Sequence, residues 1–178
     1  MRIYLAGPDV FLPDAREVGA REAALAARFG FEGVFPLDGA APEPGDWRAI
    51  AATCEGMIRG CAAIAANLTP FRGPSADPGT VFELGFARAL GLPAFGYSTV
   101  AASLRERVPD ATRDAGGRWR DPDGLEIEDF GLADNLMLEG AIAASGGVML
   151  RVPHRDDPWR DLAAFEACLS AMRRVLKG

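Results

Sequence analysis

The sequence has little of what builds metal centres and disulfide frameworks. It contains one histidine, His154, and three cysteines, and no two of the cysteines form a CxxC pair. We therefore expect no metal site of the His/Cys type. The chain opens with MRIYLAG, which reads as a strand and not as a secretory signal. Together with the odd number of cysteines, this is typical of a protein of the reducing cytoplasm.

Positive charge and long apolar runs are also scarce. The chain has 19 Lys and Arg against 25 Asp and Glu, and its basic residues are scattered apart from the pair Arg173 and Arg174. A nucleic-acid partner is not expected, because proteins that bind nucleic acids usually carry a basic patch. No window reaches about 18 uninterrupted apolar residues, so we expect neither a transmembrane helix nor a membrane partner.

What the sequence does contain is a regular alternation of strand and helix signals. At 178 residues, 49% of them hydrophobic, the chain is expected to form one domain, residues 1–178. The predicted strands cover residues 2–8, 31–37, 62–71, 92–98 and 146–152. The predicted helices cover residues 14–30, 43–60, 80–90, 101–108, 132–145 and 157–178. This alternation predicts an open α/β fold, a doubly wound parallel sheet covered by helices on both faces.

Ligands of such sheets bind at the carboxyl ends of the strands, near the point where the strand order reverses. Three segments with polar residues leave those ends. They are Ala6–Phe11, Asn67–Thr80 and an excursion or lid, residues 109–130, that runs into the sequence DNLM. Asp14 is the expected N-cap of the first helix.

Glu83 is an unusual residue for so apolar a helix. Its neighbours three and four positions away are Gly79, Thr80, Phe86 and Ala87, and none of them is basic. We place Glu83 in the first turn, where the helix dipole favours an anion. It is either a solvent-facing N-terminal acid or a nucleophile in a dry cleft, suited to an electrophilic sugar carbon.

Other candidates have a structural and a functional interpretation as well. Asp77 is either a helix cap or a second carboxylate close to Glu83. Tyr4 is either a strand aromatic or a side chain whose hydroxyl reaches the site, and Gly7 could simply be a turn glycine. Cys54 and Cys61 are seven residues apart and are interpreted as core residues.

Three stretches together resemble the nucleoside 2-deoxyribosyltransferase family. They are IYLAGPDVF, ANLTPFRGPSADPGTVFELGFARALGLP and DNLML, they occur in the family's order, and they span nearly the whole chain. The resemblance implies a flavodoxin-like fold with a five-stranded parallel sheet. It implies cleavage of the N-glycosidic bond of 2'-deoxynucleosides and transfer of deoxyribose to another base, through a covalent glutamyl intermediate. It implies no metal and no organic cofactor.

The resemblance also assigns roles to residues. It makes Glu83 the nucleophile and Tyr4 the residue that positions it. It expects Asp77 to contact the nucleoside, and it matches Asn135 and Met137 to an element that reaches into a neighbouring subunit's site. A homo-oligomer with shared sites follows. Three residues of the first loop complete the predicted substrate-binding set: Gly7, Asp9 and Phe11.

The chain departs from the family pattern on its third strand. Members usually read CDAVIAN there, with an aspartate near the base, whereas this chain reads CAAIAAN with Ala62. Cys54 stands at a commonly polar position of the preceding helix. Protonation of the leaving base could therefore differ. The alternatives are an N-glycosidase that hydrolyses a deoxynucleoside or its 5'-monophosphate, and a non-catalytic nucleoside sensor.

Overall fold

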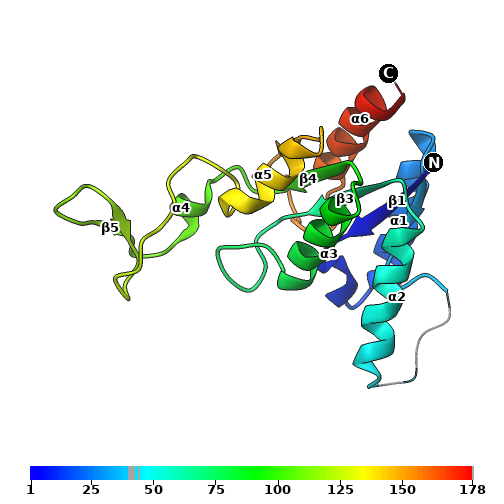
Figure 1. Ribbon diagram of the computed structural model, residues 1–178, viewed down its shortest axis with the longest axis horizontal. Helices are drawn as coiled ribbons and strands as arrows, with labels where there is room; N and C mark the ends of the chain where they lie inside the picture. Colours follow the sequence, from blue (N-terminus) through cyan, green and yellow to red (C-terminus); the bar gives the residue numbers. More distant parts are fainter. Residues whose placement is uncertain (40–42, 44, 178) are drawn as a thin grey trace.

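The chain builds a five-stranded, all-parallel sheet (Figure 1). A computed structural model describes residues 1–39, 43 and 45–177. The strands are β1 (Arg2–Ala6), β2 (Glu32–Val34), β3 (Ala63–Asn67), β4 (Ala94–Ser98) and β7 (Met149–Arg151). Their spatial order is β2-β1-β3-β4-β7. Counted in chain order this is 2-1-3-4-5, the flavodoxin-like order, whose direction reverses between β1 and β3. The predicted fold class is confirmed.

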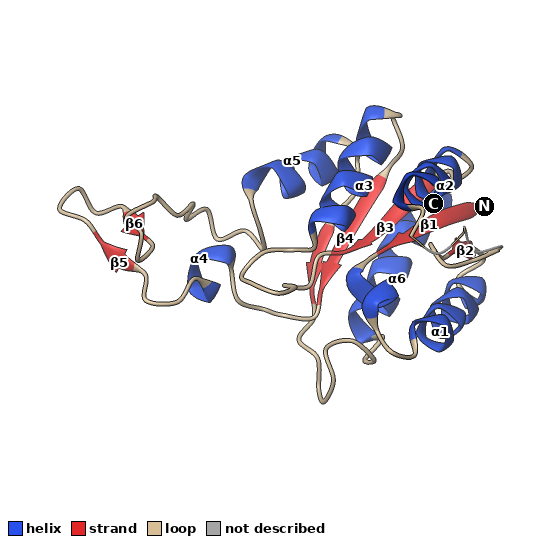
Figure 2. Cartoon of the chain, turned by 90° about the horizontal axis from the view of Figure 1, so that it is seen from below, coloured by secondary structure: helices blue, strands red, loops and turns tan. Residues whose placement is uncertain are grey.

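Helices cover both faces of the sheet (Figure 2). One face carries α1 (Ala15–Arg28) and α6 (Ala163–Lys177). The other carries α2 (Trp47–Arg59), α3 (Pro78–Ala89) and α5 (Leu136–Ala144). Among the described residues, no helix is both long and apolar enough to span a bilayer.

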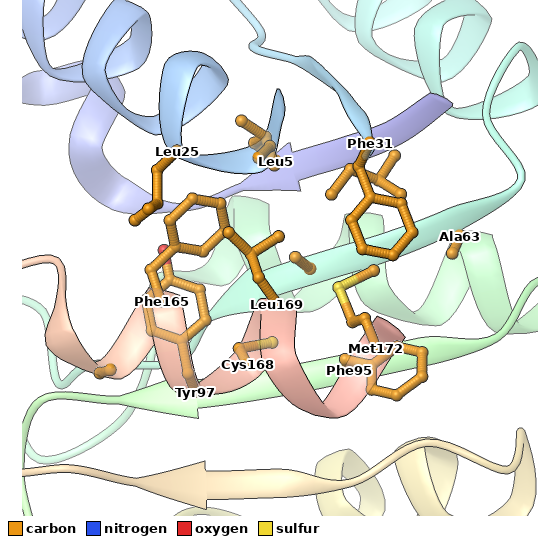
Figure 3. Close-up of a cluster of buried hydrophobic side chains, with 14 of the residues drawn as sticks. Leu5, Leu25, Phe31, Ala63, Phe95, Tyr97, Phe165, Cys168, Leu169 and Met172 are labelled. Atoms are coloured by element: carbon orange, nitrogen blue, oxygen red, sulfur yellow. The ribbon is translucent and has the colours of Figure 1, made fainter. Parts of the chain in front are cut away.

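The core consists of two clusters, one on each face. Successive side chains of a strand point to opposite faces, so Leu5 of β1 packs with α1 and α6 whereas Tyr4 packs with α2, α3 and α5. Figure 3 shows the first cluster, in which Phe165 and Leu169 of α6 meet Leu25 of α1 over the sheet. Since both faces are buried, the central strands are mostly apolar, as β3 with its sequence AIAAN illustrates.

The excursion does not form a lid. After the short helix α4 (Leu104–Arg107), it forms a hairpin of β5 (Thr112–Arg113) and β6 (Trp119–Arg120). Figures 1 and 2 both show this arm extending away from the sheet. Ion pairs within the arm, such as Arg120 with Asp114 at 3.0 Å, hold it together.

Several predicted helix ends are displaced in the structure. The closing helix begins at Ala163 and not near residue 157, because residues 157–161 form a turn in which Asp157 and Asp161 bind backbone N–H groups. Asp14 precedes α1 as predicted, but its side chain makes no capping bond and binds Arg160 instead. Pro44 and Gly178, which belong to predicted helices, lie outside the described residues.

Candidate active site

A cavity of about 370 Å³ opens beside the carboxyl ends of β1 and β2, between α2 and α3. It is lined by Gly7, Val10, Phe11, Pro36, Leu37, Ile50, Cys54, Asp77, Gly79, Thr80 and Glu83. Four residues predicted from the sequence are therefore brought together here: Gly7, Phe11, Asp77 and Glu83. A second hollow of about 440 Å³ lies on the arm and is lined by residues 117–119 and 126–130. It contains none of the predicted site residues.

Glu83, in the cavity wall, is hydrogen-bonded to Tyr4, which does not itself line the cavity. Tyr4 is fully buried in the middle of β1, and its hydroxyl donates a hydrogen bond of 2.6 Å to Glu83 Oε1. Burial raises the pKa of Glu83 to about 7, the bond from Tyr4 opposes this shift, and the negative charge of Asp77 adds to it. Burial and the adjacent carboxylate hold the pKa of Tyr4 well above its usual value. The tyrosine therefore stays a hydrogen-bond donor.

Glu83 is not in the first turn of its helix, contrary to the prediction. The helix begins at Pro78, with Asp77 as N-cap, and its first turn carries no acidic residue. Glu83 consequently lies one turn further along, where the helix dipole gives a carboxylate little support. This placement agrees with the raised pKa of Glu83, because desolvation is not offset by free backbone N–H groups.

Asp77 is both the cap of its helix and a carboxylate in the same cavity wall as Glu83. Its Oδ2 accepts hydrogen bonds from the Thr80 backbone N–H at 2.9 Å and from the Thr80 hydroxyl at 3.1 Å, which caps α3. The side chain is nevertheless part of the cavity wall. Because Oδ2 makes both capping bonds, the position of the second oxygen, Oδ1, is fixed as well. The sequence SADPGT thus fixes a carboxylate at the cavity and starts the helix that carries Glu83.

The first loop contributes its backbone and one ring, but not its carboxylate. Gly7 lines the cavity, and a Cβ at this position would lie 2.3 Å from Asp9 Oδ2 and 2.9 Å from Asn67 Cβ. Asp9 itself is buried, accepts a bond from Asn67 Nδ2 at 2.9 Å, and is not among the cavity-lining residues. Asp9 therefore ties the loops after β1 and β3 together. Phe11 lines the cavity and is more than half exposed.

Asn135 and Met137 lie outside this cavity, at the exposed start of α5. Asn135 caps the helix by accepting a bond from the Met137 N–H at 3.0 Å, and Met137 is 68% exposed. The preceding residue, Asp134, is buried and holds the loop before α3 by accepting bonds from Ser75 Oγ and the Ala76 N–H. The start of α5 is thereby tied to the loop that carries Asp77.

Ala62 lies at the amino ends of the strands, opposite the edge of the sheet where the cavity opens. It precedes β3, is exposed, and its N–H binds the carbonyl of Arg2, the first residue of β1. The length of β3, about 15 Å, separates it from the edge where the cavity opens. The expectation that an aspartate at position 62 would lie near the base is therefore wrong for this chain.

The prediction that Cys54 is a core residue is wrong, because Cys54 is only partly buried and lies in the cavity wall. Cys61 is buried, as predicted. Ile50 lies one turn before Cys54 on α2 and also faces the cavity. Pro36 and Leu37 follow β2 and complete the wall. The rule that ligands bind after the strands could have identified these two. No group of three or more His, Cys, Asp or Glu suited to a metal gathers within the described ranges.

A family model described as nucleoside 2-deoxyribosyltransferase matches residues 3–137, a range that contains Tyr4, Asp77, Glu83 and Met137. The chain belongs to the nucleoside 2-deoxyribosyltransferase family. Members of this family act on nucleosides, by glycosyl transfer or as glycosidases.

The chain is also similar to individual proteins and solved structures. An uncharacterized protein of Schizosaccharomyces pombe is 33% identical, over 82% of this chain and 78% of its own length. A structure described as a 2-desoxiribosyltransferase from Leishmania mexicana is 33% identical, covers 97% of both chains and superposes with a TM-score of 0.70. A conserved protein from Enterococcus faecalis is 20% identical, covers 98% of both chains with a TM-score of 0.58, and shares the fold.

Proposed function

We propose that the protein is a nucleoside 2-deoxyribosyltransferase that works by double displacement on Glu83. The observation that carries this proposal is the 2.6 Å bond from buried Tyr4 to Glu83, which lines a cavity together with Asp77. The bond engages Oε1, and Oε2 takes no hydrogen bond from the described residues. Oε2 is thus available to attack an electrophilic carbon.

The reaction consists of two substitutions at C1' of the sugar. In the first, Glu83 Oε2 forms a bond to C1', the C1'–N bond breaks, and the base leaves with the electron pair and takes up a proton from Asp77 or water. In the second, a ring nitrogen of an incoming base attacks C1', loses its proton, and releases the Glu83 carboxylate. Two inversions give net retention. Asp77 binds the nucleoside through Oδ1, and no cofactor takes part.

The proposed enzyme shares its sites between subunits of a homo-oligomer. Asn135 and Met137 do not line the cavity of their own chain, and Met137 exposes 68% of its surface. Leu136 and Ile50 are also exposed, and Ile50 lies at the rim of the open cavity. A second copy that covers this face would close the site.

The three free thiols suit a reducing compartment, and we propose the cytoplasm as the location of the protein.

Product analysis tests the proposal. The protein is incubated with deoxyinosine, with and without adenine, and the products are separated. New deoxyadenosine is expected with adenine present, and Glu83→Gln should lose several orders of magnitude in rate. Glu17→Gln, at an exposed position on α1, is the matched control. Free base with free sugar would mean hydrolysis, and binding without turnover would mean a sensor.

A trapping experiment isolates the covalent step. A 2-fluoro-deoxynucleoside should leave a sugar adduct on the peptide that carries Glu83, detected by mass spectrometry. The Glu83→Gln variant should acquire no adduct. An adduct on another residue would contradict the assignment of the nucleophile.

A further inference from the structure

Phe11 lines the cavity, but the short segment that carries it does little to fix the orientation of its ring. It ends a single 3-10 turn, Pro8–Phe11, and its side chain is 55% exposed. A ring on so short an element can adopt several rotamers unless neighbouring groups restrict it. The orientation of this wall must therefore depend on contacts from other segments.

Those contacts form an aromatic series that spans three loops. The ring of Phe71, in the loop after β3, stacks on Phe11 at a centroid distance of 5.2 Å and an interplanar angle of 15°. Trp159, in the loop after β7, meets Phe71 edge-on at 6.1 Å and 88°. Both distances and both orientations are favourable for aromatic pairs. Phe11 is thus packed against Phe71, and Phe71 against Trp159, and neither of these two residues lines the cavity.

A guanidinium group covers the same stack. Arg72 Cζ lies 4.5 Å from the centroid of Phe71 and 5.2 Å from that of Phe11, within the range of cation–π attraction. Its backbone φ of 55° is in the left-handed region, which is uncommon for a residue other than glycine. No ion pair or hydrogen bond engages the Arg72 side chain in the part of the chain that the structure describes.

The outer end of the series is anchored by charge. Arg160, which follows Trp159, donates two hydrogen bonds to the carboxylate of Asp14, at 3.0 and 2.6 Å. It donates a third to Asp157 at 2.8 Å. Asp14 lies only three residues beyond Phe11. The loop after β7 is therefore fixed to the segment that carries the cavity wall, and Trp159 is fixed with it.

We propose that Phe71 and Arg72 are positioning residues that hold the Phe11 ring at the cavity wall, and so set the affinity for the nucleobase that stacks on it. The inference rests on the proposed function, because it takes the ligand to be a deoxynucleoside. Purines and pyrimidines both present flat π-faces, so a fixed ring serves either class. Neither residue lines the cavity, so the chemical step is not altered directly.

Kinetics on Phe71 variants test the proposal. Phe71→Ala should raise KM for deoxyinosine about 3- to 10-fold and leave kcat within about twofold. A fold-change of this size corresponds to the loss of the interaction energy of one aromatic pair. Phe71→Tyr should restore KM, because the flat ring returns. Arg72→Ala should raise KM by a smaller factor, about 2- to 5-fold. The matched control is Phe82→Ala, since Phe82 is 57% exposed and stacks on Phe86 at 6.0 Å, outside the cavity.

A binding experiment separates this inference from the reaction. Calorimetry measures the Kd of deoxyinosine for Glu83→Gln and for Glu83→Gln combined with Phe71→Ala, with melting curves for both. A 3- to 10-fold weaker Kd supports the inference even if the wild type hydrolyses its substrate. An equal Kd, a loss confined to kcat, or an equal KM effect in Phe82→Ala overturns it. If neither the wild type nor Glu83→Gln binds a deoxynucleoside, both the proposed function and the inference are wrong.

Discussion

The Tyr4 hydroxyl, fully buried in the middle of a strand, donates a 2.6 Å hydrogen bond to Glu83 Oε1 on a helix 79 residues further along the chain. The bond favours the ionised carboxylate, whose pKa burial has raised to about 7. Tyr4 therefore holds the proposed nucleophile in place and keeps part of it ionised at neutral pH.

Replacing Tyr4 should shift the pH profile. In the wild type, kcat/KM should rise with pH through about 7 as Glu83 ionises. Tyr4→Phe removes a bond that lowers the pKa of Glu83, so the rise should move to higher pH. The rate at pH 7 should fall about 3- to 30-fold, and much of it should return at pH 9. Stopped assays between pH 5 and 9 measure this. An unshifted profile would make Tyr4 only a strand aromatic.

Removing the charge of Glu83 should stabilise the protein at high pH. The folded-state pKa of about 7 exceeds the ordinary value of 4.5, so the folded state binds more protons between these values. Stability from this group is therefore present below about 4.5 and is lost as pH rises to about 7. Glu83→Gln avoids this loss and should be more stable by on the order of 2 kcal/mol at pH 8. Urea unfolding at pH 5 and 8 tests this, and a benefit that is equal at both values would contradict it.

Cys54 should be the thiol whose modification blocks the site. It lines the cavity, whereas Cys61 and Cys168 are buried. Because burial raises the pKa of Cys54, labelling by iodoacetamide should be slow at pH 7 and faster at pH 8.5. Deoxyinosine should slow it further. Peptide mapping locates the label, and Cys61→Ala is the control that should remain sensitive. A fully labelled Cys54 in an enzyme with normal turnover would disprove this placement.

An aspartate at position 62 should change little. Ala62 is exposed at the amino end of β3, away from the cavity. Ala62→Asp should therefore keep the rate and the pH optimum of the wild type, with a stability change within about 0.5 kcal/mol. Transfer assays with deoxyinosine and adenine, together with thermal melting, measure both. Faster turnover with a new acidic limb would mean that position 62 does reach the base.

Mixing a weakened and an inactive variant tests whether subunits share sites. Asn135→Ala should weaken turnover, because it removes a side chain that we propose contributes to the site of a neighbouring subunit. Glu83→Gln should abolish turnover. Mixed oligomers should recover part of the activity, because some sites combine an intact Glu83 with an intact Asn135. Melting must accompany the assay, since losing a helix cap costs about 1 kcal/mol. No recovery despite demonstrated subunit exchange would mean that each chain builds its own site.

The sequence by itself determined the order of strands and helices and the parallel sheet, because apolar strand runs, turn residues and the segment SADPGT are local signals. The edge rule for parallel sheets then predicted which loops lie near the site, and the family resemblance associated Tyr4, Asp77 and Glu83 with one another. The arrangement of long-range partners was decided only in the tertiary structure. The Asp14 carboxylate binds Arg160, 146 residues further along the chain, and does not cap its own helix. Cys54 faces the cavity because of the way α2 packs on the sheet. Ala62 lies at the far edge because β3 begins there. A local pattern carries no information on which distant group is nearest, because that depends on how whole helices pack on the sheet.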